Sequence, residues 1–262
     1  MDAKPKIAPR RKTAPAGIRH FIGVDGCRAG WIAVHLMRDA DPWSEVVRLD
    51  RLAALRPASG SALVLIDMPI GLPDRSHPVR GCDAAARRLL GARRSSVFSP
   101  PSRGALARND HPHASAVNLR ETGRGLSRQA WGIAPKIAAL DKLLRRGRMR
   151  PARLLMWEAH PELCLWAMNR GRPMGHSKRT AEGRRERVRL LDRIQPGLRR
   201  WIKAQTPRLR ACGASADDLL DALALAVTAL RGYPDGYAVL PAEQEKDSQG
   251  LEMEMAYWAR RG

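Results

Sequence analysis

The sequence predicts an α/β fold built around one mixed β-sheet, and three observations support this. An apolar run over residues 21–24, a glycine-rich turn and a second apolar run over 31–37 are typical of a β-hairpin. Two further runs, at 62–67 and 152–159, are continuously apolar, as in strands buried on both faces. A helical section separates these two runs, and this order of strands and helices favours an α/β layout.

The other elements follow from local signals. Residues 45–50 have the pattern of a third strand, and residues 250–258 alternate well enough to form a late strand. Amphipathic or alanine- and leucine-rich patterning predicts four helices, which we expect over residues 82–94, 131–147, 180–194 and 218–232. The stretch from Pro69 to about Ala130 is rich in Pro, Gly, Ser and Arg, and its segment 93–106 predicts a polar loop between helices.

The first 20 residues predict a disordered basic tail, followed by a single domain over residues 21–262. The tail is basic and proline-dotted and has no apolar core segment, so it is not a secretory signal. No run of about 18 apolar residues exists, so no membrane span is predicted. The four cysteines form no CxxC pair, which predicts buried thiols in a reducing cytoplasm and no disulfide-linked partner. They are Cys27, Cys82, Cys164 and Cys212.

The chain carries a large surplus of positive charge. It has 47 Lys and Arg against 26 Asp and Glu, a formal net charge of +21. A surplus of this size attracts polyanions, so we expect a nucleic-acid partner. The alternative is a solvated basic surface with no specific partner.

Five acidic residues lie where apolar runs of the chain start or end: Asp25, Asp67, Glu158, Asp218 and Asp221. A carboxylate at the end of a buried strand is poorly hydrated and needs a partner. Carboxylates from distant segments can share a divalent cation if the fold brings them together. Asp218 and Asp221 are three residues apart, which places them on one face of a helix. Each acid also has a structural alternative as a helix cap, a turn residue or the partner of an arginine.

Two polar segments combine cations with hydroxyl groups, the combination that suits phosphate oxygens. They contribute the predicted nucleic-acid-binding residues Arg94, Ser95, Ser96, Lys178 and Arg179. A solvated loop is the alternative for each segment.

Several motifs occur in an order that resembles the DUF429 family, whose members are described as predicted RNase H-like nucleases. The motifs are GVDGCRAGW, LIDMPIGLP, CDAAARRLLGARRSSVFSPPSR, WGIAPKI, EAHPELCLWAMN, SKRT and ADDLLDALALA. The resemblance covers residues 21–258. Asp218 and Asp221 also fit the D-x-x-D-A-L-A pattern in the last helix of RuvC-type junction resolvases. The resemblance implies a ribonuclease-H-like five-stranded mixed sheet flanked by helices, with a helical insertion between the fourth and fifth strands.

The resemblance further implies that metal-binding acids lie on central strands and on the last helix. We therefore expect a nuclease dependent on Mg²⁺ or Mn²⁺ that hydrolyses phosphodiester bonds of DNA or RNA. Asp67 stands where resolvases usually carry the longer Glu, and we expect Glu158 to supply the missing reach. The predicted catalytic and metal-binding residues are Asp25, Asp67, Glu158, Asp218 and Asp221. Two alternatives remain: a small-molecule phosphotransferase with an actin-like fold, and a non-catalytic nucleic-acid-binding protein.

Overall fold

A five-stranded mixed sheet forms the centre of the computed structural model, which describes residues 9–38, 45–58, 60–147, 153–211 and 213–259. The strand order is β4-β3-β2-β5-β6. Strands β2, β3 and β4 are antiparallel neighbours, whereas β5 is parallel to both β2 and β6. The strands are β2 (His20–Cys27), β3 (Gly30–Met37), β4 (Glu45–Leu49), β5 (Ala62–Ile66) and β6 (Leu154–Glu158). The predicted α/β class with one central mixed sheet is thereby confirmed.

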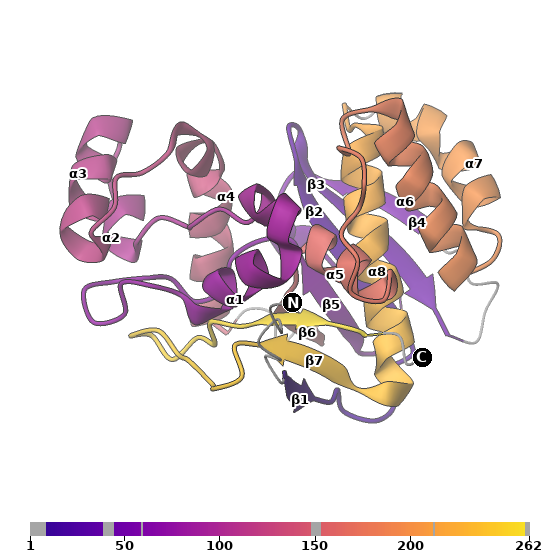
Figure 1. The fold of residues 1–262 in the computed structure, drawn as a ribbon, viewed down its shortest axis with the longest axis horizontal. Helices are drawn as coiled ribbons and strands as arrows, with labels where there is room; N and C mark the ends of the chain where they lie inside the picture. The colour runs from indigo at the N-terminus through magenta and orange to yellow at the C-terminus, as the bar shows by residue number, and fades with distance from the viewer. Residues whose placement is uncertain (1–8, 39–44, 59, 148–152, 212, 260–262) are drawn as a thin grey trace, which may run out of the picture.

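Alternate residues of the central strands face two separate apolar cores. Leu65 packs in the core that contains helix α8 (Ala216–Asp235), whereas its neighbour Ile66 packs in the core that contains helix α4 (Arg128–Arg145). Figure 1 shows α8 lying across β2 and β3. Burial on both faces explains why β5 is continuously apolar in sequence.

Helix α8 packs unusually close to β2 because of one glycine. A Cβ at Gly23 would overlap the carbonyl oxygen of Ala222 and the amide nitrogen of Ala226, so the helix backbone lies directly on the strand. A capping box fixes the start of the same helix, since Ser215 and Asp218 each accept a hydrogen bond from the other's backbone amide. The cap and the close contact together set the position of the first turns of α8.

A helical insertion connects β5 to β6, the fourth and fifth strands of this sheet. It comprises α1 (Gly81–Leu90), η2 (Gly91–Ser96), α2 (Arg103–Leu106), α3 (His111–Thr122) and α4. Helix α2 lies within segment 93–106, where we expected a polar loop, and α3 lies in a stretch for which no element was predicted. Ser102 and Asp110 cap them by accepting amide hydrogen bonds from Ala105 and His113. These helices extend to the left of the sheet in Figure 1.

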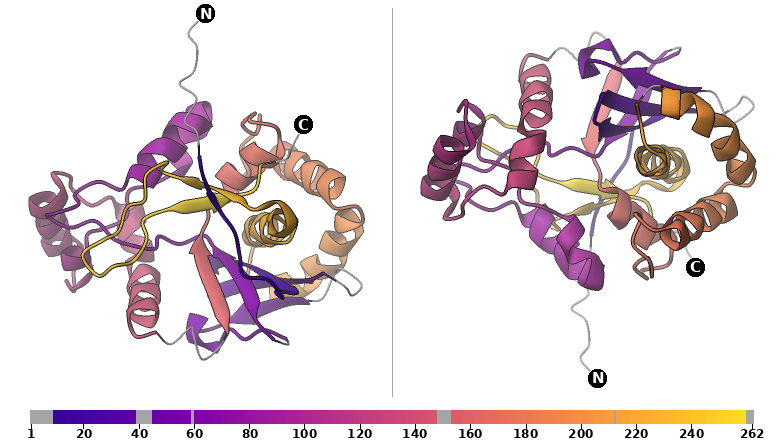
Figure 2. Two further views of the ribbon diagram at one scale, coloured as in Figure 1. Left: turned by 90° about the horizontal axis from the view of Figure 1, so that it is seen from below. Right: turned by 90° about the horizontal axis from the view of Figure 1, so that it is seen from above.

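Three helices that follow β6 pack around α8. They are α5 (Pro161–Met168), α6 (Ala181–Ile194) and α7 (Leu198–Ala211). A short helix, η1 (Leu52–Ala54), lies between β4 and β5. Figure 2 shows α8 end-on, enclosed between the five-stranded sheet and the pair α6 and α7. This enclosure explains why α8 is buried over most of its length.

A second, three-stranded antiparallel sheet has the order β1-β7-β8, with β1 (Arg10–Lys12), β7 (Tyr237–Leu240) and β8 (Met255–Tyr257). Here the structure differs from the expected disordered tail, since residues 10–12 form a strand. Arg10 and Lys12 both form ion pairs with the buried Glu254, and Lys12 lies 4.7 Å from the Trp157 ring centroid. Acidic partners far along the chain thus neutralise these cations and order the segment. The late strand is also shorter than the predicted 250–258.

Cys27, Cys82 and Cys164 are free and buried, as predicted, whereas Cys212 lies outside the described residues. Among the helices that the structure describes, none combines the length and apolar character needed to cross a membrane.

The contact between β2 and α8 can be tested with two glycine substitutions. Gly23→Ala should lower the free energy of unfolding by about 1–3 kcal/mol or more, because its methyl group meets backbone atoms that cannot rotate away. Gly132→Ala in α4 is the matched control: its Cβ meets nothing within 4 Å, so it should raise stability by roughly 0.5–1 kcal/mol. Urea denaturation measures both, and equal stabilities for the two variants would contradict the packing described.

Candidate metal centre

Two aspartates lie side by side at the carboxyl edge of the central strands. Val24 pairs in register with Ile66, so Asp25 and Asp67 follow at neighbouring positions, and the Asp67 amide donates to the Val24 carbonyl at 2.9 Å. Because side chains alternate along a strand, both aspartates point to the same face as Gly23, which is the face covered by α8.

Asp221, in the second turn of α8, completes the group. One carboxylate oxygen each from Asp25, Asp67 and Asp221 lies within 4.8 Å of the other two. Asp25 is 8% exposed and Asp221 is 2% exposed, whereas Asp67 is half-buried. The fold therefore concentrates three carboxylates from distant segments at one poorly hydrated point.

The concentration of negative charge changes the pKa values of all three acids. Burial raises the pKa of Asp25 well above its ordinary value, and the charges of Asp67 and Asp221 raise it further. Burial also raises the pKa of Asp67, and His160 and Lys178 oppose this rise. Burial raises the pKa of Asp221 to about 6, against the opposing effect of Lys178. Negative charge at this group is thus only partly compensated by the surrounding side chains.

Lys178 supplies the cation that faces this group, and its ammonium forms an ion pair with Asp221. Burial acts to lower the pKa of Lys178, but the charge of Asp221 outweighs it and raises that pKa above its ordinary range. The Lys178 side chain remains 43% exposed, against 3% for Asp221. One half-exposed ammonium thus stands against three carboxylates.

The loop that carries Lys178 is held by contacts on three sides. Gly183 in α6 approaches the carbonyl of Ser177 so closely that a Cβ would overlap it. Arg187, which is fully buried, donates to the His176 carbonyl at 3.1 Å and forms an ion pair with Glu162 of α5. Arg93 of η2 donates to the Met174 carbonyl at 2.9 Å. The position of Lys178 is therefore fixed by its surroundings.

The structure does not bring Glu158 into the three-aspartate group. Glu158 pairs in register with Ile66 and so points to the α4 face, opposite to Asp67. There it accepts the Ile70 amide at 2.6 Å and forms an ion pair with Arg80, which also binds Asp83 at 3.0 Å.

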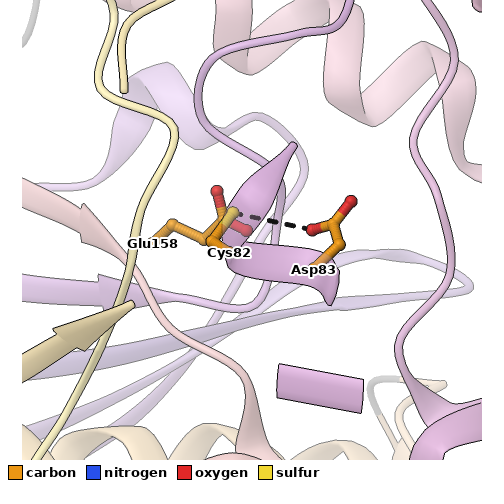
Figure 3. A group of neighbouring side chains, drawn as sticks. All are labelled: Cys82, Asp83 and Glu158. Carbon is orange, nitrogen blue, oxygen red and sulfur yellow. Dashed lines mark hydrogen bonds between the residues drawn. The ribbon is translucent and has the colours of Figure 1, made fainter. Parts of the chain in front are cut away.

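Glu158 belongs instead to a second cluster, with Cys82 and Asp83 (Figure 3). The Cys82 thiol lies 3.7 Å from an Asp83 carboxylate oxygen. Burial raises the pKa of Glu158 to about 8, and Arg80 opposes that rise. Arg80 is 2% exposed, so this cluster already encloses its own cation.

Asp218 is also engaged elsewhere, in the capping box at the start of α8. Its charge contributes to the raised pKa of Asp25, so it lies near the group, but it is not one of the three converging acids. The two helical acids that we predicted as a pair therefore have different places, one in the cap and one in the cluster.

The predicted phosphate-binding residues lie around the site in two segments. Arg94 and Ser95 are exposed in η2, and Ser96 donates its hydroxyl to the Arg93 carbonyl at 2.8 Å. Arg179 is exposed next to Lys178. Contact of these residues with nucleic acid remains a prediction.

Two residues near the site, Glu162 and Arg187, were not predicted from the sequence as site residues. Glu162 raises the pKa of both Asp67 and Asp221 by its charge, and its Oε2 atom is buried without a hydrogen-bond partner among the described residues. Arg187 anchors it. The sequence does carry a helix-start signal at Pro161, which places Glu162 in the first turn of α5, but it contains no sign that this turn faces α8.

The three aspartates fit the metal centre that the sequence predicted. All are oxygen donors, which Mg²⁺ and Mn²⁺ prefer, and they converge from three elements within the reach of one ion. Burial is the main cause of the raised pKa values of Asp25 and Asp221, and a bound cation would oppose that rise by stabilising the ionised carboxylates. Asp25, Asp67 and Asp221 are thus the residues that would hold such an ion.

A family model described as "Protein of unknown function (DUF429)" matches residues 23–246. The match covers most of the chain, including all three aspartates, and the chain belongs to this family. No curated protein and no solved structure matches the chain.

Burial and the neighbouring carboxylates disfavour the ionised form of Asp25, so we expect Asp25→Asn to stabilise the metal-free protein at neutral pH. A raised pKa in the folded state means that wild-type stability declines as the pH rises from the ordinary value of 3.8 upward. The stability difference between Asp25→Asn and wild type should therefore be near zero at about pH 4 and grow with pH. Each 1 kcal/mol corresponds to a rise of roughly 2–4 °C in Tm, measurable by calorimetry with chelator present. A difference independent of pH would contradict this.

Divalent ions provide a test of which acids form the centre. Mn²⁺ should raise the Tm of wild-type protein and of Glu158→Gln by similar amounts, because Glu158 faces away from the three aspartates. The same addition should have little effect on Asp67→Asn. Loss of the Mn²⁺-induced shift in Glu158→Gln would instead assign Glu158 to the centre.

Proposed function

We propose that this member of the DUF429 family is a metal-dependent nuclease that hydrolyses phosphodiester bonds of DNA or RNA. The observation that carries the proposal is the convergence of Asp25, Asp67 and Asp221 at one buried point. Carboxylates gathered in this way bind Mg²⁺ or Mn²⁺ and are typical of phosphoryl-transfer sites.

The arrangement of the sheet supports the proposal. Three antiparallel strands followed by two parallel ones, in the order β4-β3-β2-β5-β6, agree with a ribonuclease-H-like sheet. The acids occupy the places that this likeness implies: two on neighbouring central strands and one on the last long helix. Strand order and acid placement are independent features of the chain, so their agreement strengthens the inference.

A bound divalent ion would supply an activated water and stabilise charge on the leaving oxygen. The protein's own residues prepare the site for that chemistry. The Gly26 amide donates to Asp25 Oδ1 at 2.7 Å and helps to fix the orientation of this buried carboxylate. Lys178, half-exposed beside Asp221, is placed to donate to a non-bridging phosphate oxygen of an approaching strand.

His160 lies on the other side of Asp67. Its Nε2 atom is 3.2 Å from the Ser96 carbonyl, and its Nδ1 atom is buried without a hydrogen-bond partner among the described residues. His160 and Lys178 both act to lower the pKa of Asp67, against the effect of burial. We assign to His160 the role of orienting Asp67, as histidines beside carboxylates commonly do.

Cleavage assays test the proposal. With Mg²⁺ or Mn²⁺, wild-type protein should cut at least one of single-stranded, duplex, hybrid or branched substrates, and Asp67→Asn should lower the rate by a factor of 100 or more because an ion ligand is lost. Glu182→Gln, which neutralises an exposed acid on α6, is the control and should retain the wild-type rate.

Two outcomes would favour the alternatives. If no substrate is cut and ATP raises the Tm, a phosphotransferase is the better assignment. If nucleic acid binds with a steep salt dependence but chelators change neither binding nor any cleavage, the protein is a non-catalytic binder.

A further inference from the structure

A hollow of about 450 Å³ lies between α4 and the segments at the start of β3 and around η1, at the same end of the central sheet as the metal centre. Four cations line it: Arg51, Lys136, Lys142 and Arg146. We call it the cationic groove. Trp31 and Leu52 contribute to its apolar lining. In Figure 1, α4, which forms one side of the groove, lies to the left of the sheet, towards the insertion helices α2 and α3.

The four cations of the groove have no acidic partners in the part of the chain that the structure describes. Among the described residues, no carboxylate lies within 4.0 Å of any of their charged groups. The one acid in the lining, Asp50, is bound by Arg48 at 2.7 Å. Most cations elsewhere in a protein interior or cleft are paired, so an uncompensated set around one hollow attracts an anion.

The distribution of charge along α4 supports this. Lys136, Lys142 and Arg146 line the groove, whereas Asp141 is turned away and bound by Arg103 at 2.9 Å and by Arg145 at 2.8 Å. Attraction to the helix dipole accounts for cations in the last turn of α4. It does not account for Lys136, near the middle of the helix.

Lys136 connects the groove to the metal centre. Its aliphatic stem covers Gly26, where a Cβ would meet Lys136 Cδ at 3.0 Å. Gly26 follows Asp25 and pairs in register with Trp31, which lines the groove. Gly26 faces α4 whereas Asp25 faces α8, so the groove begins at the same end of the sheet as the carboxylate cluster, on the opposite face, and runs along α4 away from it.

We propose that the cationic groove binds the sugar-phosphate backbone of a nucleic-acid strand adjacent to the phosphate at the metal centre. This inference rests on the proposed function, since it supplies the flank of the same substrate. The ten residue-to-residue steps from Lys136 to Arg146 extend about 15 Å along the helix. That length exceeds the rise of about 3.4 Å per phosphate along one DNA strand, so the face contacts more than one phosphate.

The experiment measures binding of a fluorescent single-stranded oligonucleotide to Asp25→Asn protein in chelator, over a series of salt concentrations. Lys142→Gln/Arg146→Gln removes two exposed groove cations. Arg199→Gln/Lys203→Gln removes two exposed cations of α7 and is the matched control for net charge. The slope of log K against log salt should decrease in magnitude by about 1.4 in the groove variant, since each phosphate contact contributes about 0.7. The control should keep the parent slope.

Equal slopes for the groove and control variants would overturn the inference. The inference would also be overturned if the groove variant lost as much affinity for a deoxynucleoside 5′-phosphate as for the oligonucleotide, because the groove would then be a site for small anions. A groove effect without any cleavage by wild-type protein would retain the groove and reject the nuclease. Cleavage with no difference between the slopes would retain the nuclease and reject the groove.

Discussion

The direct packing of α8 on β2 is the contact on which the candidate site depends. Gly23 has no side chain, so the carbonyl of Ala222 lies against the strand where any other residue would push the helix outward. Asp221 precedes Ala222, and Asp25 lies two residues beyond Gly23 on the same face of the strand. The closeness of helix and strand is therefore what allows a helical and a strand carboxylate to share one ligand.

Two acidic clusters lie at this edge of the sheet, and their counter-cations distinguish them. Arg80 is enclosed between Glu158 and Asp83 with 2% of its surface exposed, so its removal would leave buried charges unpaired. The counter-cation of the other cluster is Lys178, whose side chain is half-exposed and faces three carboxylates. In the first cluster one enclosed guanidinium faces two carboxylates, whereas in the second one half-exposed ammonium faces three, so the second cluster has the larger excess of negative charge for an exchangeable ion to satisfy.

Local patterns in the sequence predicted most strands and the acids that end them, but they could not supply the pairing register. Asp25, Asp67 and Asp221 were identified because each interrupts an apolar run. Glu158 also ends an apolar run, but its pairing with Ile66 turns its side chain to the other face of the sheet. A shift of one residue in this register would reverse the face, and only the pairing of the strands in the fold determines it. The strand at Arg10–Lys12 likewise depends on β7, more than 200 residues away. Long-range contacts also determine where Lys178 lies.

The arrangement of charge also bears on how a polyanion could reach a group of carboxylates. Phosphates are repelled by Asp25, Asp67 and Asp221 when no ion is bound. Lys178 lies beside these acids on the α8 face of the sheet, and Lys136 lies over Gly26 on the α4 face at the same end. In the proposed function, a nucleic-acid strand bound by both lysines would pass across this end of the sheet. A divalent ion bound by the aspartates would remove the remaining repulsion, and metal binding and strand binding would then reinforce each other.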